Sequence, residues 1–237
     1  MARAFSADSF ALGTFLRRLP DAVRDRLLAL GTTVEFQPGH TLMRQDEDDG
    51  PVFLLLKSVT KVMARAENGA EVLLAIRLSG DIVGEMAPLS HGARSATVIT
   101  CGASVVSVIR GAVFLDFMHQ HAAVGVALSR LMAERLRWAN ERRLDFAGYD
   151  TGVCLARLLL TLAERHGSST EEGLDLGIAL TQAELGGLVG AKEGTIQKAM
   201  RGLRGHGFIH HHRQRIIITD PQGLAAFGNL PIPFNPY

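Results

Sequence analysis

The residues with the clearest chemical potential lie in a short stretch, GEMAPLSHGARSATV, at positions 84 to 98. Glu85 stands near its start, and Arg94 and Ser95 stand near its end. A guanidinium offers phosphate oxygens a planar fork of donors, and free N–H groups at a helix start attract the same anion. The carboxylate would repel a phosphate unless it faces another part of the ligand, such as a sugar hydroxyl. The combination suggests a nucleotide.

A purely structural interpretation of the same stretch is also open. An ion pair between Arg94 and Glu85 would hold the two ends of the loop together without any ligand. Residue types alone do not separate the two interpretations.

A second group of candidate residues lies in LTQAELGGLVGAKEGTIQKAMRGLRGHGFI, residues 180 to 209. Thr181 and Glu184 form the T-x-x-E pattern of a capping box, which satisfies free N–H groups at a helix start. Gly190 can take the positive φ that a tight turn needs. A second helix is expected from about Lys192 to Arg204. It would bury Ile196, Met200 and Leu203 and present Gln197, Lys198, Arg201 and Arg204 outward.

This pattern is typical of a helix-turn-helix, whose second helix enters the major groove of DNA. The segment FIHHHRQRIIITD follows, and its alternation around Arg213 and Gln214 predicts a two-stranded wing. From Gly177 onward the chain carries six Lys and Arg against three Asp and Glu, whereas the formal net charge of the whole chain is +1. This local excess suits a phosphate-facing surface. For the helical spacing alone, a generic helical hairpin is the alternative.

Three adjacent histidines, His210 to His212, raise the question of a metal site. Successive side chains of a strand point to opposite faces, so the three cannot converge on one ion, and no metal is expected. An enzyme that uses His91, His119 or this tract is the hypothesis from another functional class. No spacing of nucleophile, base and orienting group supports it. Haem or iron–sulfur sensing is disfavoured because no cluster of cysteines exists.

Several kinds of element must position these residues. A short helix is expected within residues 19 to 31, and brief apolar runs with regular turn signals from 33 to about 108 predict an antiparallel sandwich or barrel of the jelly-roll kind. From 114 to 146 the spacing predicts one long helix, proposed as a dimer seam, with an intramolecular capping helix as the alternative. Beyond Gly148 another helix is expected, followed by a loop from Gly167 to Gly173. The expected fold is α+β, with a β-barrel domain at 1–113, a dimerisation helix at 114–147, a winged helix-turn-helix at 148–222 and an extended tail at 223–237.

Composition is consistent with a folded soluble protein of two modest domains. The chain has 237 residues, of which 47% are hydrophobic and 21% charged. No apolar run approaches the roughly 20 residues that cross a bilayer, and the start lacks the apolar region of a secretory signal, so a cytoplasmic location is expected. Cys101 and Cys154 lie far apart and are expected to be buried, without a disulfide framework.

The cassette residues carry a family resemblance. Gly84-Glu85-Met86-Ala87 through Arg94-Ser95-Ala96-Thr97-Val98 resembles the phosphate-binding cassette of cyclic-nucleotide-binding domains, and Pro38-Gly39 followed by Leu42 and Gln45 resembles the early strand turns of that family. The order of barrel, long helix and winged helix-turn-helix is similar to that of the cyclic-AMP receptor protein superfamily of bacterial transcription factors, over about residues 15 to 220.

The resemblance implies roles for individual residues. Glu85 would hold the ribose 2′-hydroxyl, Arg94 would bind the cyclic phosphate, and Arg135 matches a second arginine near that phosphate. The implied ligand-binding set is Gly84, Glu85, Met86, Ala87, Arg94, Ser95, Arg135 and Asn140. The implied DNA-binding set is Thr181, Lys192, Glu193, Thr195, Gln197, Lys198, Arg201 and Arg213.

The chain departs from the family pattern at two places. Family activators that use cyclic AMP carry a polar pair on the long helix, whereas Ala139 and Asn140 stand here, so only Asn140 can reach the base across the dimer. At the DNA-reading helix, the usual Ser or Thr cap, Arg-Glu pair and later Arg are replaced. The residues found there are Lys192, Glu193, Gly194 and Lys198. Because lysine lacks bidentate guanine recognition, a different operator or low sequence selectivity is expected.

By this resemblance, the expected function is that of a homodimeric DNA-binding transcription regulator under allosteric control by a cyclic nucleotide, with cyclic AMP as the expected ligand and RNA polymerase as an expected partner. No enzymatic activity and no membrane partner are expected. The alternative is a regulator that binds DNA without ligand and keeps the cassette as a relic of the fold.

Overall fold

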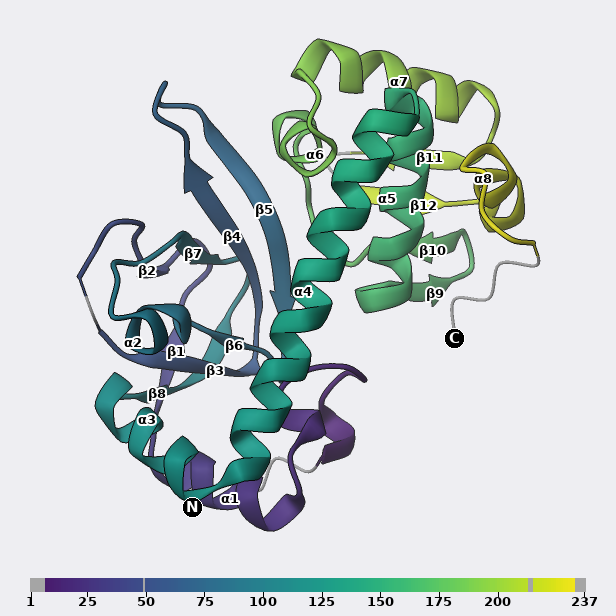
Figure 1. The fold of residues 1–237 in the computed structure, drawn as a ribbon. Coiled ribbons are helices and arrows are strands. Elements are labelled where there is room, and N and C mark those ends of the chain that lie inside the picture. The colour runs from purple at the N-terminus through teal and green to yellow at the C-terminus, as the bar shows by residue number, and fades with distance from the viewer. Residues whose placement is uncertain (1–6, 49, 213–214, 233–237) are drawn as a thin grey trace. The chain divides into compact units, whose positions relative to one another are not determined.

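The computed structural model describes residues 7–48, 50–212 and 215–232. The chain forms two compact units, residues 1–136 and 137–237, and the division falls inside the long helix α4 (Ala122–Gly148) (Figure 1). Each unit is considered by itself.

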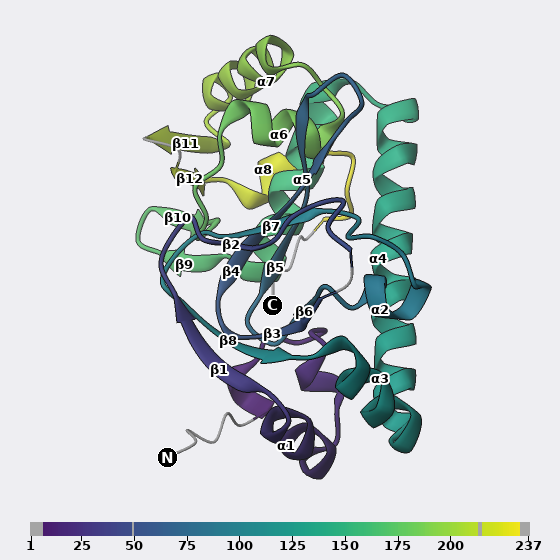
Figure 2. The same cartoon turned by 90° about the vertical axis from the view of Figure 1, so that its left-hand side faces the viewer.

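The N-terminal unit is built on two antiparallel four-stranded sheets, with the short helix α1 (Asp21–Ala29) before them (Figure 2). This arrangement confirms the expected helix and β domain. The first sheet has the order β1 (Thr32–Phe36), β8 (Ser104–Ile109), β3 (Val52–Lys57) and β6 (Ile82–Val83). The second has the order β2 (Thr41–Met43), β7 (Thr97–Thr100), β4 (Val59–Arg65) and β5 (Glu71–Leu78).

The continuous apolar run of β3 has a simple explanation, because this strand is covered on both faces. Its side chains alternate between two clusters. Phe53 and Leu55 belong to the core between the sheets, together with Val98 of β7. Val52 and Leu54 belong to the core that the helices complete. Helical contributors to that second core include Leu27, Phe114, Leu128 and Leu131, and Phe15 joins them from a turn before α1.

The single helix expected over residues 114 to 146 is wrong, because the chain forms two helices there, α3 (Gly111–Gln120) and α4. The break lies at His121, whose φ of −129° and ψ of 87° are not helical. Its ring stacks on Phe117 at a centroid distance of 3.9 Å, and its Nδ1 lies 3.0 Å from the Phe117 carbonyl oxygen. A side chain that competes for a helix carbonyl favours such an interruption without any proline.

The C-terminal unit packs helices against a small antiparallel sheet. Its helices are α5 (Thr151–His166), α6 (Gln182–Val189), α7 (Glu193–Gly205) and α8 (Pro221–Phe227). Its strands are β9 (Ser168–Thr170), β10 (Gly173–Asp175), β11 (Ile209–His212) and β12 (Arg215–Ile218), in the order β11-β12-β10-β9. The expected wing is confirmed as the β11–β12 pair.

Three expectations need correction, two for the C-terminal unit and one for the cysteines. The segment 167–173, expected to be a loop, holds β9 and the start of β10, which pair with each other and join the wing through β12. The tail expected from 223 begins inside α8, whose first turn is capped by Asp220. Cys154 is buried as expected, but Cys101 is exposed because it lies in the turn between β7 and β8.

Candidate nucleotide site and DNA-binding helices

The carboxylate of Glu85 is buried and paired. Glu85 lies directly before the short helix α2 (Met86–Ser90), and only 2% of its surface is exposed. Its Oε1 accepts a hydrogen bond of 2.7 Å from Nη1 of Arg135 on α4. The other terminal nitrogen of Arg135 donates to the carbonyl of Ile82 at 2.9 Å and lies 3.8 Å from a carboxylate oxygen of Asp81. The loop alternative, in which Glu85 pairs with Arg94, is therefore wrong.

The guanidinium of Arg94 is also buried, with 3% of the residue exposed. Nη1 donates to the carbonyl oxygen of Gly84 at 2.5 Å, and Nη2 donates to that of Pro51 at 2.7 Å. The backbone of Arg94 is bonded to the β2–β3 loop, because its N–H donates to Glu47 and its carbonyl accepts from Asp46. Gly84 after β6, Pro51 before β3 and the β2–β3 loop thus hold the buried guanidinium of Arg94 in place within the cassette.

Backbone geometry at Gly84 makes this approach possible. Its φ is +82°, and a Cβ atom there would lie 2.7 Å from Nη1 of Arg94 and 3.0 Å from the carbonyl oxygen of Pro51. Both the left-handed backbone and the close guanidinium require glycine. Arg94 can therefore occupy this position only because residue 84 is a glycine.

The other expected ligand residues differ in their surroundings. Ala87 is buried, whereas Met86 is 50% exposed. Ser95 is exposed, with its hydroxyl 3.8 Å from the Met86 sulfur. Asn140 lies exposed on the part of α4 that belongs to the C-terminal unit. The structure thus brings the cassette residues together with Arg135 of α4. This group holds two buried charges of opposite sign, the carboxylate of Glu85 and the guanidinium of Arg94.

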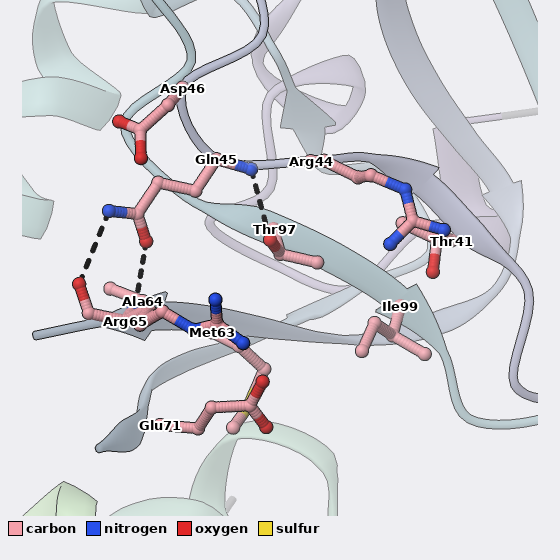
Figure 3. Close-up of a pocket in the computed structure, with 10 residues that line it drawn as sticks. All are labelled: Thr41, Arg44, Gln45, Asp46, Met63, Ala64, Arg65, Glu71, Thr97 and Ile99. Carbon is pink, nitrogen blue, oxygen red and sulfur yellow. Dashed lines mark hydrogen bonds between the residues drawn. The ribbon is translucent and has the colours of Figure 1, made fainter. Parts of the chain in front are cut away.

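A cavity of about 290 Å³ lies elsewhere in the N-terminal unit (Figure 3). Its floor includes Thr97 and Ile99, which alternate with the core residue Val98 and so point away from the space between the sheets. The amide group of Gln45 donates to and accepts from the backbone of Arg65 at one end of it. Of the lining residues, Thr97 alone belongs to the cassette, and its side chain lies on the outer face of the sheet.

The helix-turn-helix is formed by α6 and α7. Thr181 caps α6 by accepting from the Glu184 N–H at 3.1 Å, and the Glu184 carboxylate accepts from the Thr181 N–H at 2.8 Å, which confirms the capping box. Gly190 ends α6 in the left-handed conformation, with φ of +67°. A Cβ atom there would come within 2.6 Å of the ring of Phe146, so the turn packs tightly on the C-terminal part of α4.

The second helix, α7, buries the expected apolar stripe and exposes its polar residues. Ile196, Met200 and Leu203 are each at most 1% exposed. Lys192 is the N-cap residue and makes no side-chain cap, as its type leads one to expect. Of the expected DNA-contacting residues, Arg213 lies outside the described residues. Those on α7, namely Glu193, Thr195, Gln197, Lys198 and Arg201, are all exposed.

One group of residues was not anticipated from the sequence. Arg142 on α4 donates a hydrogen bond to the carbonyl of Leu188 in the last turn of α6, and its guanidinium lies 4.3 Å from the ring centroid of Trp138. Burial lowers the pKa of Arg142 to about 10. Arg165 lies over the same ring at 5.5 Å. Trp138 and Arg142 are four residues apart on α4, whereas the contacts to Leu188 and Arg165 join α4 to other helices and so leave no local pattern in the sequence.

Comparison with known proteins agrees with the description of the N-terminal β domain and with that of the helix-turn-helix. The model of the cyclic nucleotide-binding domain matches residues 33–121, and the model of the Crp-like helix-turn-helix domain matches residues 155–227. A CRP-like cAMP-activated global transcriptional regulator from Mycobacterium tuberculosis is 32% identical over 81% of this chain and 86% of its own length. The chain belongs to the CRP/FNR family of transcription regulators.

Other relatives of this CRP/FNR regulator are more distant. The cAMP-activated global transcriptional regulator CRP of Salmonella typhimurium is 28% identical over 75% of this chain and 85% of its own length. The fold is similar to that of the c-di-GMP responsive global regulator CLP of Xanthomonas campestris, with a TM-score of 0.69 and 19% identity over 84% of this chain and 99% of that one. These matches confirm the expected family and fold.

No group of three or more His, Cys, Asp or Glu side chains that could hold a metal ion is found within 7–48, 50–212 and 215–232. No helix of that part of the chain is long and apolar enough to span a membrane. As a CRP/FNR regulator, the protein belongs to a family of DNA-binding regulators rather than enzymes.

Proposed function

We propose that this CRP/FNR regulator is a homodimer whose affinity for DNA is controlled by a cyclic nucleotide bound at the cassette, with cyclic AMP as the ligand. The observation that carries the proposal is the pair of buried charges. Arg94 is held beside the cassette by two backbone carbonyls, and Glu85 is held by Arg135. Arginine suits the cyclic phosphate, and a buried carboxylate suits a sugar hydroxyl.

Control by the ligand would pass through Arg135. This residue is part of α4, and it contacts the carboxylate that we assign to the ribose. A ligand hydroxyl that donates a hydrogen bond to Glu85 changes the surroundings of Arg135 directly. Because a ligand shifts an equilibrium only by its differential affinity for two states, this contact supplies a physical route for the shift. Asn140 is the residue proposed to face the base from a second copy.

The dimer itself is proposed to form along α4. Val126 and Leu144 are 51% and 70% exposed, and at 3.6 residues per turn they share one face of the helix with Ala133 and Asn140. Apolar side chains of this size that repeat along one helical face favour helix pairing. In such a dimer, Asn140 of one copy would lie near the nucleotide site of the other copy.

The remaining assignments follow from the family. We propose a cytoplasmic location, and contact with RNA polymerase once the dimer is bound to DNA. Binding to successive major grooves would place the two α7 helices about 34 Å apart. The competing function is a regulator that binds DNA without ligand and keeps the cassette as a relic of the fold.

Calorimetry with cyclic AMP and cyclic GMP tests the ligand assignment directly. We expect saturable binding of cyclic AMP by the wild-type protein and its loss in Arg94→Ala. Circular dichroism of the variant is the control for folding. An absence of heat with either nucleotide, at concentrations up to millimolar, would favour the ligand-independent regulator instead.

A further inference from the structure

The cavity on the outer face of the second sheet contains none of the residues proposed to bind the nucleotide (Figure 3). Its floor is formed by residues of β2, β7 and β4 that are neighbours in the strand register. Ile99 of β7 stands opposite Thr41 of β2, and Thr97 stands opposite Met63 of β4. All four are only partly exposed. The floor therefore combines two apolar side chains with two hydroxyl groups.

Two irregularities in strand pairing lie beside this floor. The register of β2 against β7 shifts between Thr41 and Met43, and the register of β4 against β5 shifts between Val62 and Met63. A bulge bends its strand and redirects side chains, and bulges are frequent next to active sites. Regular pairing would give this face of the sheet a flatter surface. The two shifts thus help to form the hollow.

Gln45 ties the wall of the cavity to its floor (Figure 3). Its side-chain amide donates to the carbonyl of Arg65 at 3.3 Å and accepts from the N–H of Arg65 at 2.6 Å. Its backbone N–H donates to the hydroxyl of Thr97 at 3.0 Å. These bonds join the start of the β2–β3 loop to the end of β4. They bring Arg44 and Arg65, which belong to different elements, to one cavity.

Charged side chains of both signs line the cavity. Arg44, Arg65 and Glu71 are exposed, and no hydrogen bond or ion pair of these three side chains is found within 7–48, 50–212 and 215–232. Arg65 and Glu71 form no such pair although they stand opposite each other in the β4–β5 register. Asp46 is a second acid in the lining. Two cations and two anions suit a ligand that carries both signs and no net charge.

We propose that this cavity binds a zwitterionic amino acid with an apolar side chain. Arg44 and Arg65 would bind the α-carboxylate through guanidinium forks, and Glu71 would accept hydrogen bonds from the α-ammonium group. The side chain of the ligand would lie over Met63 and Ile99. The volume of about 290 Å³ is close to the lower end of the range for ligand pockets, roughly 300 Å³, which suits so small a molecule. This site is independent of the proposed nucleotide site, and its test uses no cyclic nucleotide.

Calorimetry with the full chain tests the class of ligand. We expect L-leucine to bind saturably, and glycine to bind more weakly by about fourfold for each methylene that the cavity buries. N-acetyl-L-leucine lacks the ammonium group, and leucinamide lacks the carboxylate. Each should bind about tenfold more weakly than L-leucine or worse, because a hydrogen bond to a charged group is lost.

Variants test the location of the site. We expect Arg44→Gln and Arg65→Gln each to weaken the binding of L-leucine by about tenfold. Ile99→Ala should weaken the binding of L-leucine but not that of glycine, because only the longer side chain reaches the floor. Arg26→Gln is the matched control, since Arg26 is exposed on α1 and does not line the cavity. It should bind L-leucine as the wild type does, and circular dichroism of each variant checks folding.

Three results would overturn the proposal. The first is that none of L-leucine, L-methionine and L-phenylalanine binds at concentrations near its solubility limit. The second is that inorganic phosphate or N-acetyl-L-leucine binds as tightly as L-leucine, which would indicate a simple anion site. The third is unchanged binding of L-leucine by Arg44→Gln/Arg65→Gln, which would place the amino acid elsewhere on the protein.

Discussion

Arg135 joins the long helix to the nucleotide cassette, because its guanidinium lies 2.7 Å from the buried carboxylate of Glu85. The two residues are 50 positions apart. The side chain of Glu85 is 3% exposed and that of Arg135 is 18% exposed, so the pair is shielded from water. A ligand group that contacts Glu85 would share its carboxylate with Arg135 of α4. We expect the pair to stabilise the N-terminal unit, and in the proposed function it is the point where the ligand meets the helix.

Removal of one partner should destabilise the N-terminal unit strongly. In Arg135→Met the carboxylate of Glu85 would stay buried without a cation, which typically costs about 3 kcal/mol. The double variant Glu85→Gln/Arg135→Met should recover much of this loss, because no unpaired charge remains. Urea denaturation of the single and double variants measures the coupling. An Arg135→Met protein that unfolds at the wild-type midpoint would show that the pair adds no stability.

Gly84→Ala should displace Arg94, the residue proposed to bind the cyclic phosphate. The new Cβ would lie 2.7 Å from Nη1 of Arg94, and the left-handed backbone at this position costs a non-glycine residue roughly 1–2 kcal/mol. We expect cyclic nucleotide binding to be lost, as measured by calorimetry. Gly92→Ala is the control in the same loop, since its Cβ would meet only the Ser90 hydroxyl at 3.4 Å. Equal binding by both variants would contradict the role of Gly84.

The turn of the helix-turn-helix should depend on Phe146. Gly190→Ala brings a Cβ within 3.0 Å of three ring atoms at a positive φ, so we expect a loss of about 2 kcal/mol or more in unfolding free energy. Phe146→Ala removes the ring and should make the additional cost of Gly190→Ala smaller. A double-mutant cycle on thermal unfolding measures this difference. Strict additivity of the two changes would rule out the predicted clash.

Acid should weaken the C-terminal unit through His166. Burial, the largest cause, lowers the pKa of His166 from 6.5, and Arg165 acts in the same direction. Its Nδ1 lies 2.6 Å from the Leu176 carbonyl, and its Nε2 is buried without a partner within the described residues. The unfolded chain therefore binds the proton first, and stability falls as the pH drops below about 6.5 toward the folded-state pKa.

Unfolding monitored between pH 7.5 and 5 checks this expectation. The wild-type midpoint should decrease over the range, and the decrease should be smaller in His166→Asn, whose amide can still donate to Leu176 but does not titrate. If both proteins lose stability in parallel with acid, another group is responsible.

Much of the architecture could be predicted because it depends on local sequence patterns. Short apolar runs between Gly and Pro turns indicated the strands, and Thr181 with Glu184 indicated the start of α6. The break at His121 could not be predicted, because it depends on a ring that stacks within one helix and carries no Gly or Pro signal. The β9–β10 pair was missed for a similar reason, since β9 is exposed and gains its place through pairing with β10 in the wing sheet.

The candidate site was predicted in its residue types but not in its pairing. Glu85 and Arg94 were predicted to bind the sugar and the phosphate of a nucleotide, and an ion pair between them was the structural alternative. Each is instead satisfied by a group from another element, Arg135 for the carboxylate and two backbone carbonyls for the guanidinium. Such long-range partners depend on how sheets and helices pack, which spacing alone does not specify.

The most direct test of the account is a DNA-binding titration of the wild-type protein and Arg94→Ala, with and without cyclic AMP, at several salt concentrations. We predict that cyclic AMP tightens or loosens wild-type binding by about 5- to 150-fold. Arg94→Ala should show no response while keeping the same basal, salt-dependent binding. An identical Kd for the wild-type protein with and without cyclic AMP, or an undiminished response in Arg94→Ala, would contradict control through the cassette.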